Sequence, residues 1–153
     1  MNGKIFTLRN LYQSGTEKLE KAGIREAKLD AWYLLEYKTG ISRAVFLADP
    51  DREVEEEKAE SYQKDICTRA RRIPLQHITG EQEFMGLNFK VNENVLVPRQ
   101  DTEILVEEAL KRIRPDMQIL DMCTGSGCIL ESILKFGEKK QMHLKGTGCD
   151  ISE

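Results

Sequence analysis

The C-terminal stretch of the chain, residues 119–153, restricts the possible folds more than any other part of the sequence. A short apolar run ends at Asp121, two glycines follow at Gly125 and Gly127, and an apolar run then resumes. This order is typical of a strand, a tight loop and a helix. Glycines in such a loop permit positive φ angles and close ligand approach, while the helix start offers unpaired N–H groups. A second strand-like segment ends at Asp150, so the stretch predicts a strand–helix–strand unit that binds a nucleotide-like cofactor.

Asp150 is the residue expected to hold the ribose of that cofactor. A carboxylate at the end of the second strand can accept hydrogen bonds from both ribose hydroxyls, and its separation from Gly127 fits one such unit. In the alternative interpretation Asp150 merely ends a strand and Asp121 caps the helix. A doubly wound sheet needs several more strands than the two in this stretch.

Composition indicates a soluble globular protein. The chain has 153 residues, is 40% hydrophobic and 32% charged, and carries a net charge of −3. This length accommodates a small domain and part of another. No apolar run is long enough to cross a bilayer, and the N-terminus lacks the apolar core of a signal peptide, so we expect a cytoplasmic protein with no membrane partner.

The four cysteines, at positions 67, 123, 128 and 149, show no metal-ligand spacing, so no metal is expected and reduced, buried thiols are predicted. The near-neutral charge balance gives no footprint for nucleic acid. A local cluster of Arg69, Arg71 and Arg72 is interpreted as a solvated helix end.

The first half of the sequence predicts a small helical domain. Thr7 is a suitable N-cap for a helix that ends near Gly23, and Gly40 is a natural stop for a second helix over residues 25–39. Ser42 can cap a short piece through residue 47, and a charged helix with a thin apolar stripe is expected over 54–72. The predicted core positions of these helices are Leu8, Leu11, Tyr12, Leu19, Leu29, Trp32, Tyr33, Leu35, Ala59, Tyr62, Ile66 and Ala70.

Alternating polarity replaces the helical period after Pro74. Residues 83–91 alternate around Gly86, and a short apolar run follows at 95–97, which predicts a β-hairpin or a pair of short strands. Asp101 or Thr102 can then cap a helix. The expected apolar face of that helix contains Ile104, Leu105, Ala109 and Leu110.

The order of these segments closely resembles the HemK/PrmC family. The resemblance is carried by Glu-Phe-Met-Gly-Leu-Asn-Phe-Lys-Val at 83–91, Pro-Arg-Gln-Asp-Thr-Glu at 98–103 and Asp-Met-Cys-Thr-Gly-Ser-Gly at 121–127. It covers the whole chain loosely and residues 74–153 closely. A glycine-rich loop alone would be weak evidence, but joined to the other two segments it is specific.

The resemblance implies a fold and a function. The fold would be α/β: a helical substrate-recognition domain at 1–73, a β-hairpin linker at 74–98, and at 99–153 an incomplete, truncated Rossmann-like domain that begins strand–helix–strand. The function would be release factor glutamine methyltransferase, which transfers a methyl group from S-adenosylmethionine to the side-chain amide of a glutamine in peptide-chain release factors. The partners would be those release factors, without direct contact to nucleic acid.

The resemblance also assigns residues. The loop would wrap the methionine portion of S-adenosylmethionine, Asp121 would orient its ammonium group and Asp150 would hold its ribose. Arg99 and Thr102 would lie beside the substrate cleft; otherwise they form a charged turn and an N-cap. The candidate cofactor-binding residues are therefore Asp121, Cys123, Thr124, Gly125, Ser126, Gly127 and Asp150.

Three departures from the family pattern bear on activity. Cys123 stands where the family has the first loop glycine, which would cost about 1–2 kcal/mol if that position needs positive φ. Gln100 replaces a proline, which loosens that turn. The sequence contains no Asn-Pro-Pro-Tyr, the motif that would hold the substrate glutamine, so no catalytic residue is assigned and the chain alone is expected to be inactive.

Two alternatives stay open. One is a non-catalytic module that binds release factors through the helical domain, and the other is a different protein or amine methyltransferase with a similar front half. Because a two-stranded unit exposes sheet edges and one sheet face, we also expect marginal stability or self-association.

Overall fold

The computed structural model describes residues 5–151 and divides into two compact units, with the boundary between Thr79 and Gly80. The first unit is helical, whereas the second combines helices with two small sheets. The fold class predicted from the sequence, α/β with a helical N-terminal part, is confirmed. No helix in the described part of the chain is long and apolar enough to span a membrane.

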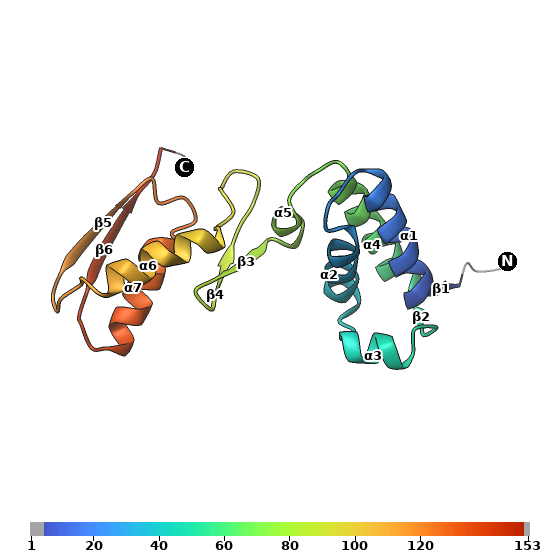
Figure 1. Cartoon of the computed structure of the whole chain (residues 1–153), viewed down its shortest axis with the longest axis horizontal. Coiled ribbons are helices and arrows are strands. Elements are labelled where there is room, and N and C mark those ends of the chain that lie inside the picture. Colours follow the sequence, from blue (N-terminus) through green and yellow to red (C-terminus); the bar gives the residue numbers. More distant parts are fainter. Residues whose placement is uncertain (1–4, 152–153) are drawn as a thin grey trace. The chain divides into compact units, whose positions relative to one another are not determined.

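Three long helices make up most of the first unit (Figure 1). They are α1 (Leu8–Lys21), α2 (Ala27–Thr39) and α4 (Glu56–Ala70), and each packs against the other two. Two short helices complete the unit, α3 (Arg43–Ala48) and α5 (Leu75–Thr79). A two-residue antiparallel ladder pairs β1 (Phe6–Thr7) with β2 (Glu53–Val54).

Capping residues fix the ends of these helices largely as the sequence predicts. The Thr7 hydroxyl accepts a hydrogen bond from the Asn10 N–H at 3.3 Å, so Thr7 is the N-cap of α1. Gly40 ends α2 with a left-handed φ of 70°. Ser42 occupies the N-cap position of α3, but its side chain makes no capping hydrogen bond.

The core of the helical unit consists of leucines with Trp32 and Tyr62, which are 5% and 0% exposed. The thin stripe predicted for α4 is confirmed, because Ala59, Tyr62 and Ile66 are all buried. Two predicted core positions are wrong, since Leu29 and Tyr33 are 41% and 46% exposed. They lie four residues apart on one face of α2, and α1 and α4 cover the other faces of that helix.

The second unit begins with an antiparallel hairpin of β3 (Glu81–Phe84) and β4 (Leu87–Lys90). Its two-residue turn has positive φ at Met85 (54°) and Gly86 (70°), as the tightest hairpins require. The rings of Phe84 and Phe89 are buried and pack edge to face, with their centroids 6.2 Å apart. The alternative of a strand at 95–97 is wrong: no neighbouring strand pairs with that segment, and Pro98 after it lacks an N–H donor.

Helix α6 (Glu103–Leu110) follows a 3-10 turn, η1 (Gln100–Thr102). The predicted caps are wrong, because Thr102 makes no side-chain capping bond and Asp101 lies inside the turn. The Glu103 carboxylate instead accepts the Met85 N–H at 2.7 Å. The predicted apolar face is also partly wrong, since Ile104 and Leu105 are 63% and 54% exposed. The helix is oriented so that Val106 is buried, and the partly buried Ala109 and Leu110 pack beside it.

The predicted strand–helix–strand unit is present. Strand β5 (Gln118–Met122) pairs in parallel with β6 (Lys145–Cys149), and α7 (Cys128–Lys139) connects them (Figure 1). Helix α7 covers one face of this sheet closely, because a Cβ on Gly146 would lie 2.8 Å from the Cδ1 atoms of Leu130 and Leu134. The neighbouring side chains Leu120 and Met122 of β5 are 61% and 65% exposed.

The prediction of buried thiols holds for one cysteine only. Cys128 is buried at the start of α7, whereas Cys67, Cys123 and Cys149 are exposed, and all four are free. Two of the exposed thiols stand where strands end, Cys123 directly after β5 and Cys149 as the last residue of β6. The arginine cluster does mark a helix end, with Arg71 at the C-cap of α4 and Arg69 paired with Asp30 at 2.7 Å.

Candidate cofactor-binding site

The carboxyl ends of β5 and β6 meet at one edge of the sheet, where loop 123–127 begins. The Thr124 N–H donates to the Cys149 carbonyl at 2.9 Å, so the parallel pairing continues one step into the loop. The Gly127 N–H then donates to the Thr124 carbonyl at 2.9 Å and closes a tight turn. Ligands of open α/β sheets bind at this edge, outside the carboxyl ends of the strands.

Asp121 fixes the first half of the loop. Its Oδ2 accepts the hydroxyl proton of Thr124 at 2.7 Å. Gly148 makes room for this arrangement, since a Cβ there would lie 3.1 Å from Cγ2 of Thr124. The alternative that Asp121 caps the helix is wrong, because Gly127 occupies the N-cap position of α7 and no side chain makes a capping bond there.

Asp150 joins the end of β6 to the same loop. Its Oδ2 accepts the backbone N–H of Gly125 at 2.8 Å, across 25 residues of sequence. Asp150 is exposed, and a carboxylate has about four acceptor positions on its two oxygens. Asp150 therefore does more than end a strand.

The loop backbone is left-handed at three positions, with φ of 61° at Cys123, 54° at Gly125 and 76° at Gly127. Glycine adopts this conformation at little cost, but a cysteine is strained there by about 1–2 kcal/mol. The sequence predicted a cost for Cys123 if its position requires positive φ, and Cys123 does have a positive φ. Past Gly127, the first N–H groups of α7 have no intrahelical acceptor and face the loop.

The remaining predicted residues lie around this centre in different ways. Ser126 is half-buried within the loop. Arg99 and Thr102 are joined to each other, because the Thr102 N–H donates to the Arg99 carbonyl at 3.0 Å, and Arg99 is exposed. The contact between their segment and the loop comes from Val95, whose Cγ2 would lie 3.8 Å from a Cβ on Gly125.

Two residues of the site were not singled out from the sequence. Val95 gives no chemical signal, because an aliphatic side chain in a loop has no distinctive pattern. Gly148 did carry one, since the pair Gly146 and Gly148 alternates along a strand, where glycine usually marks the close approach of another group.

The arrangement offers donors and acceptors at complementary places. Backbone N–H groups of the loop and of the α7 start suit an anionic end of a ligand. The carboxylates of Asp121 and Asp150 suit a cationic group and a diol, respectively. The loop is therefore suited to a ligand that combines an amino-acid part with a ribose.

Comparison with known proteins defines the class of the helical unit first. Residues 10–80 match the family model described as the PrmC N-terminal domain, so this segment belongs to that domain family.

The curated relatives carry one common name, "Release factor glutamine methyltransferase". The protein from Geobacter sulfurreducens is 37% identical over 86% of this chain and 46% of its own length. That from Clostridium botulinum is 42% identical over 80% and 44%, and that from Caulobacter vibrioides is 36% identical over 95% and 50%. The resemblance to the HemK/PrmC family is confirmed, and the chain spans about half the length of the curated relatives it matches.

Proposed function

We propose that this chain supplies the substrate-recognition and cofactor-binding portion of a release factor glutamine methyltransferase. The observation that supports this most strongly is the combination of the relatives' common name with the Asp121–Thr124 and Gly125–Asp150 bonds around the loop. A chance glycine loop would have no reason to be held by carboxylates from both strands.

The three segments predicted from the sequence receive distinct roles in this proposal. Residues 1–73 recognise the release factor, 74–98 link the two parts, and 99–153 bind S-adenosylmethionine. The helical segment has its own closed hydrophobic core, which suits an independent recognition role. Arg99 and Thr102 are proposed to face the substrate cleft, next to the segment that places Val95 against the loop.

The residues present fit S-adenosylmethionine. Loop N–H groups and the α7 start would hold its carboxylate, Asp121 its ammonium group and Asp150 its ribose hydroxyls. The exposed Cys123 and the half-buried Thr124 and Ser126 would flank the methionine part, beside the left-handed Gly125 and Gly127. Bound there, the cofactor supplies a methyl group on a sulfonium sulfur.

Methyl transfer to an amide needs more than this binding site. An amide nitrogen is a weak nucleophile because its lone pair is delocalised, so the nitrogen must be held in line with the methyl carbon and sulfur. In the family, the Asn-Pro-Pro-Tyr motif is expected to accept the amide hydrogens. This sequence has no such motif, so we propose that these residues bind the cofactor and do not transfer the methyl group by themselves.

The assay that tests this proposal mixes the purified chain, radiolabelled S-adenosylmethionine and a purified bacterial release factor. The expected result is binding of cofactor without labelling of the release factor. Labelling of a glutamine would overturn the proposed lack of activity. In a parallel reaction with free amines or a cell extract in place of the release factor, labelling of an amine or of another protein would favour the alternative of a different methyltransferase.

The second candidate function is a release-factor-binding module without chemistry. It is favoured by the family match, which covers residues 10–80 alone. The same binding assay separates the two functions with the Asp150→Ala variant. A module would bind the release factor but show no affinity for S-adenosylmethionine in either form, whereas the cofactor-binding portion would lose its affinity only in the variant.

A further inference from the structure

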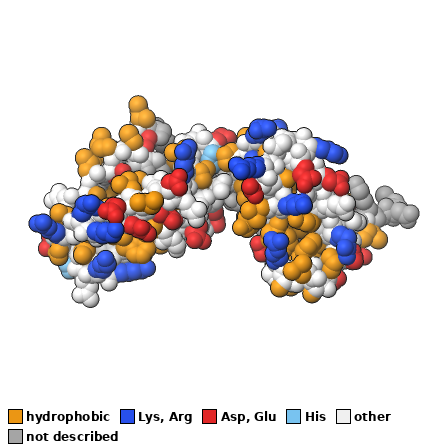
Figure 2. All heavy atoms as spheres, viewed as in Figure 1, with side chains coloured by type: hydrophobic (Ala, Val, Ile, Leu, Met, Phe, Trp, Pro, Cys, Tyr) orange, Lys and Arg blue, Asp and Glu red, His pale blue; other side chains and the backbone are white. Residues whose placement is uncertain are grey.

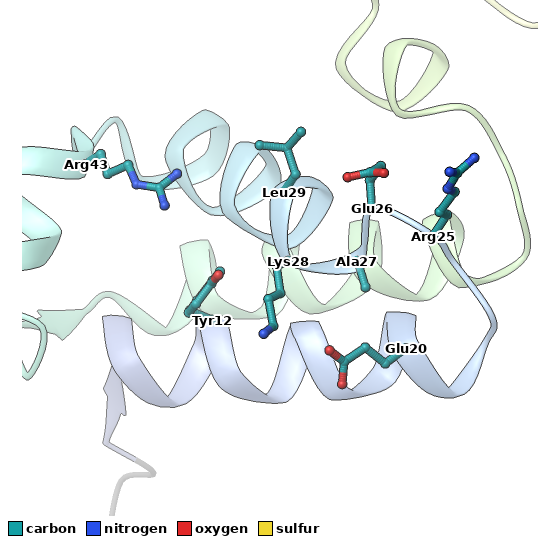
Figure 3. A pocket seen from close by; sticks show the side chains of 8 residues that line it. All are labelled: Tyr12, Glu20, Arg25, Glu26, Ala27, Lys28, Leu29 and Arg43. Carbon is teal, nitrogen blue, oxygen red and sulfur yellow. The ribbon is translucent and has the colours of Figure 1, made fainter.

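A groove of about 420 Å³ lies on the helical unit. Its lining comes from α1, the start of α2 and the first residue of α3 (Figure 3). The lining residues are Tyr12, Glu20, Arg25, Glu26, Ala27, Lys28, Leu29 and Arg43. Three cations and two carboxylates leave the lining with one net positive charge.

The cations of this groove make no salt bridge with the described residues of the unit. Elsewhere in the unit Arg69 pairs with Asp30, Lys38 with Asp65 and Arg9 with Asp51. Within residues 5–151, by contrast, no ion pair forms at Arg25, Lys28 or Arg43. The three cations make no salt bridge and outnumber the two carboxylates of the lining, and this balance favours a negatively charged group on the ligand.

Aromatic packing gives the groove a firm wall. The Tyr12 ring packs edge to face on Trp32 at 6.5 Å and on Phe46 at 5.5 Å. The Arg43 guanidinium lies 5.6 Å from the centre of the Trp32 ring, which holds this cation in place. In Figure 3 the Lys28 side chain extends toward α1 and that of Arg43 extends from the start of α3. The groove therefore has one cation held against an aromatic ring, Arg43, and one on a flexible aliphatic side chain, Lys28.

An exposed apolar stripe continues from the groove along α2. Leu29 lines the groove, and Tyr33, one turn further, is 46% exposed. Figure 2 shows apolar side chains beside Lys and Arg on the surface of this unit. Tyrosine and arginine are enriched among protein–protein hot spots, and both residue types line this groove.

We propose that this groove docks an acidic, leucine-like segment of a partner protein. A carboxylate of the segment lies between Lys28 and Arg43, and its apolar side chain packs on Leu29 and Tyr33. The carboxylates of Glu20 and Glu26 accept N–H groups of the segment's backbone. These same two carboxylates repel a polyanion, so the lining fits an acidic peptide better than a nucleic acid.

The test uses the whole chain and a fluorescein-labelled peptide of alternating Glu and Leu residues, with binding followed by fluorescence anisotropy. The double variant Lys28→Glu, Arg43→Glu should bind about tenfold more weakly or worse, and added salt should weaken binding to the wild type. The matched control, Lys64→Glu with Arg52→Glu, changes the net charge equally at exposed positions outside the groove and should bind as the wild type does.

A peptide of alternating Lys and Leu residues should bind the double variant better than the wild type, which shows that the variant is folded. Equal binding of the acidic peptide by both proteins, or no binding by the wild type, would overturn the inference. Tighter binding of a single-stranded oligonucleotide, lost in the same variant, would also overturn it.

The inference does not depend on which protein supplies the segment. If the proposed function holds, a release factor should show the same loss in the double variant. A release factor that binds both forms equally, while the acidic peptide distinguishes them, would uphold the groove and count against the release factor as its occupant. The peptide result thus tests the groove, and the release factor result separately tests whether a release factor occupies it.

Discussion

The carboxylate of Asp150 accepts the backbone N–H of Gly125 at 2.8 Å, and this bond joins the end of one parallel strand to the loop that leaves the other. Together with the 2.7 Å bond between Thr124 and Asp121, it holds the loop from both sides. The site thus has its shape before any ligand arrives, which lowers the ordering cost of binding.

Asp150 should be the residue whose loss affects cofactor affinity most. Replacement with Ala removes both the bond to Gly125 and the proposed ribose contact, and each charge-assisted bond contributes about 1.5–3 kcal/mol. We expect a loss of S-adenosylmethionine affinity of tenfold or more by calorimetry. Asp150→Asn keeps an acceptor for Gly125 and should recover part of the loss. Equal affinities in all three proteins would exclude Asp150 from the site.

Cys123→Gly should tighten cofactor binding and stabilise the fold. Cysteine at φ 61° is strained by about 1–2 kcal/mol, and glycine relieves that strain at an unfolded-state entropy cost of about 0.4–1 kcal/mol. A melting temperature raised by a few degrees is expected. Asp116→Gly, at φ 62° and outside the loop, is the matched control: it should stabilise similarly and leave affinity unchanged. Reduced affinity of the Cys123 variant would mean that the thiol itself contacts the ligand.

Thr124 tests the other half of the loop. Thr124→Val removes the hydroxyl that donates to Asp121 and leaves that carboxylate without its donor, so cofactor affinity should fall. Thr124→Ser retains the hydroxyl and should bind like the wild type. If the valine and serine variants bind equally, the bond does not shape the site.

Tyr62 should make the helical unit sensitive to alkaline pH. Its side chain is fully buried, and its hydroxyl has no hydrogen-bond partner among residues 5–151. Burial raises the pKa of the phenol well above its ordinary value of 10.0. Above that pH the unfolded chain releases this proton while the folded chain keeps it. The folded state therefore loses about 1.4 kcal/mol per pH unit.

Phenylalanine at position 62 should remove this component of the pH dependence. Urea unfolding at neutral and alkaline pH measures the difference between the two proteins. Because the hydroxyl is unpartnered, Tyr62→Phe should cost little or even stabilise the fold at neutral pH. Identical slopes of stability against alkaline pH would show that Tyr62 titrates alike in both states.

The exposed sheet face should cause self-association. Leu120 and Met122 lie on β5 with 61% and 65% of their surfaces exposed, next to an unpaired strand edge. Light scattering should show concentration-dependent mass for the wild type and a monomer for Leu120→Lys, Met122→Lys. A monomeric wild type with a concentration-independent melting transition would contradict this expectation.

Much of the fold followed from local chemistry that the sequence displays openly. The Thr7 cap, the Gly40 stop, the turn at Gly86 and the strand–helix–strand order depend on neighbouring residues alone. The errors include the cap of α6, the strand expected at 95–97, three exposed cysteines and the buried faces of α2 and α6. Ile104 and Leu105 are as apolar as Val106, and the choice among them depends on how α6 meets α7 and the hairpin.

The candidate site divides in the same way. Asp150 was selected because its separation from Gly127 suits a ribose contact, and Asp121 because the family resemblance assigns it a role. The bonds that they make to Gly125 and Thr124 required three-dimensional placement. The sequence predicted strain at Cys123 only if that position has positive φ. The angle itself could not be predicted, because a cysteine gives no indication of it.

The central claim is that loop 123–127 and Asp150 bind S-adenosylmethionine. The most direct test is a titration of the ¹⁵N-labelled chain with S-adenosylmethionine, followed through its ¹H–¹⁵N NMR spectrum, which detects weak binding residue by residue. The account predicts saturable shifts concentrated at the N–H groups of residues 123–128 and 150. An unchanged spectrum, or shifts centred on the groove between α1 and α2, would contradict it.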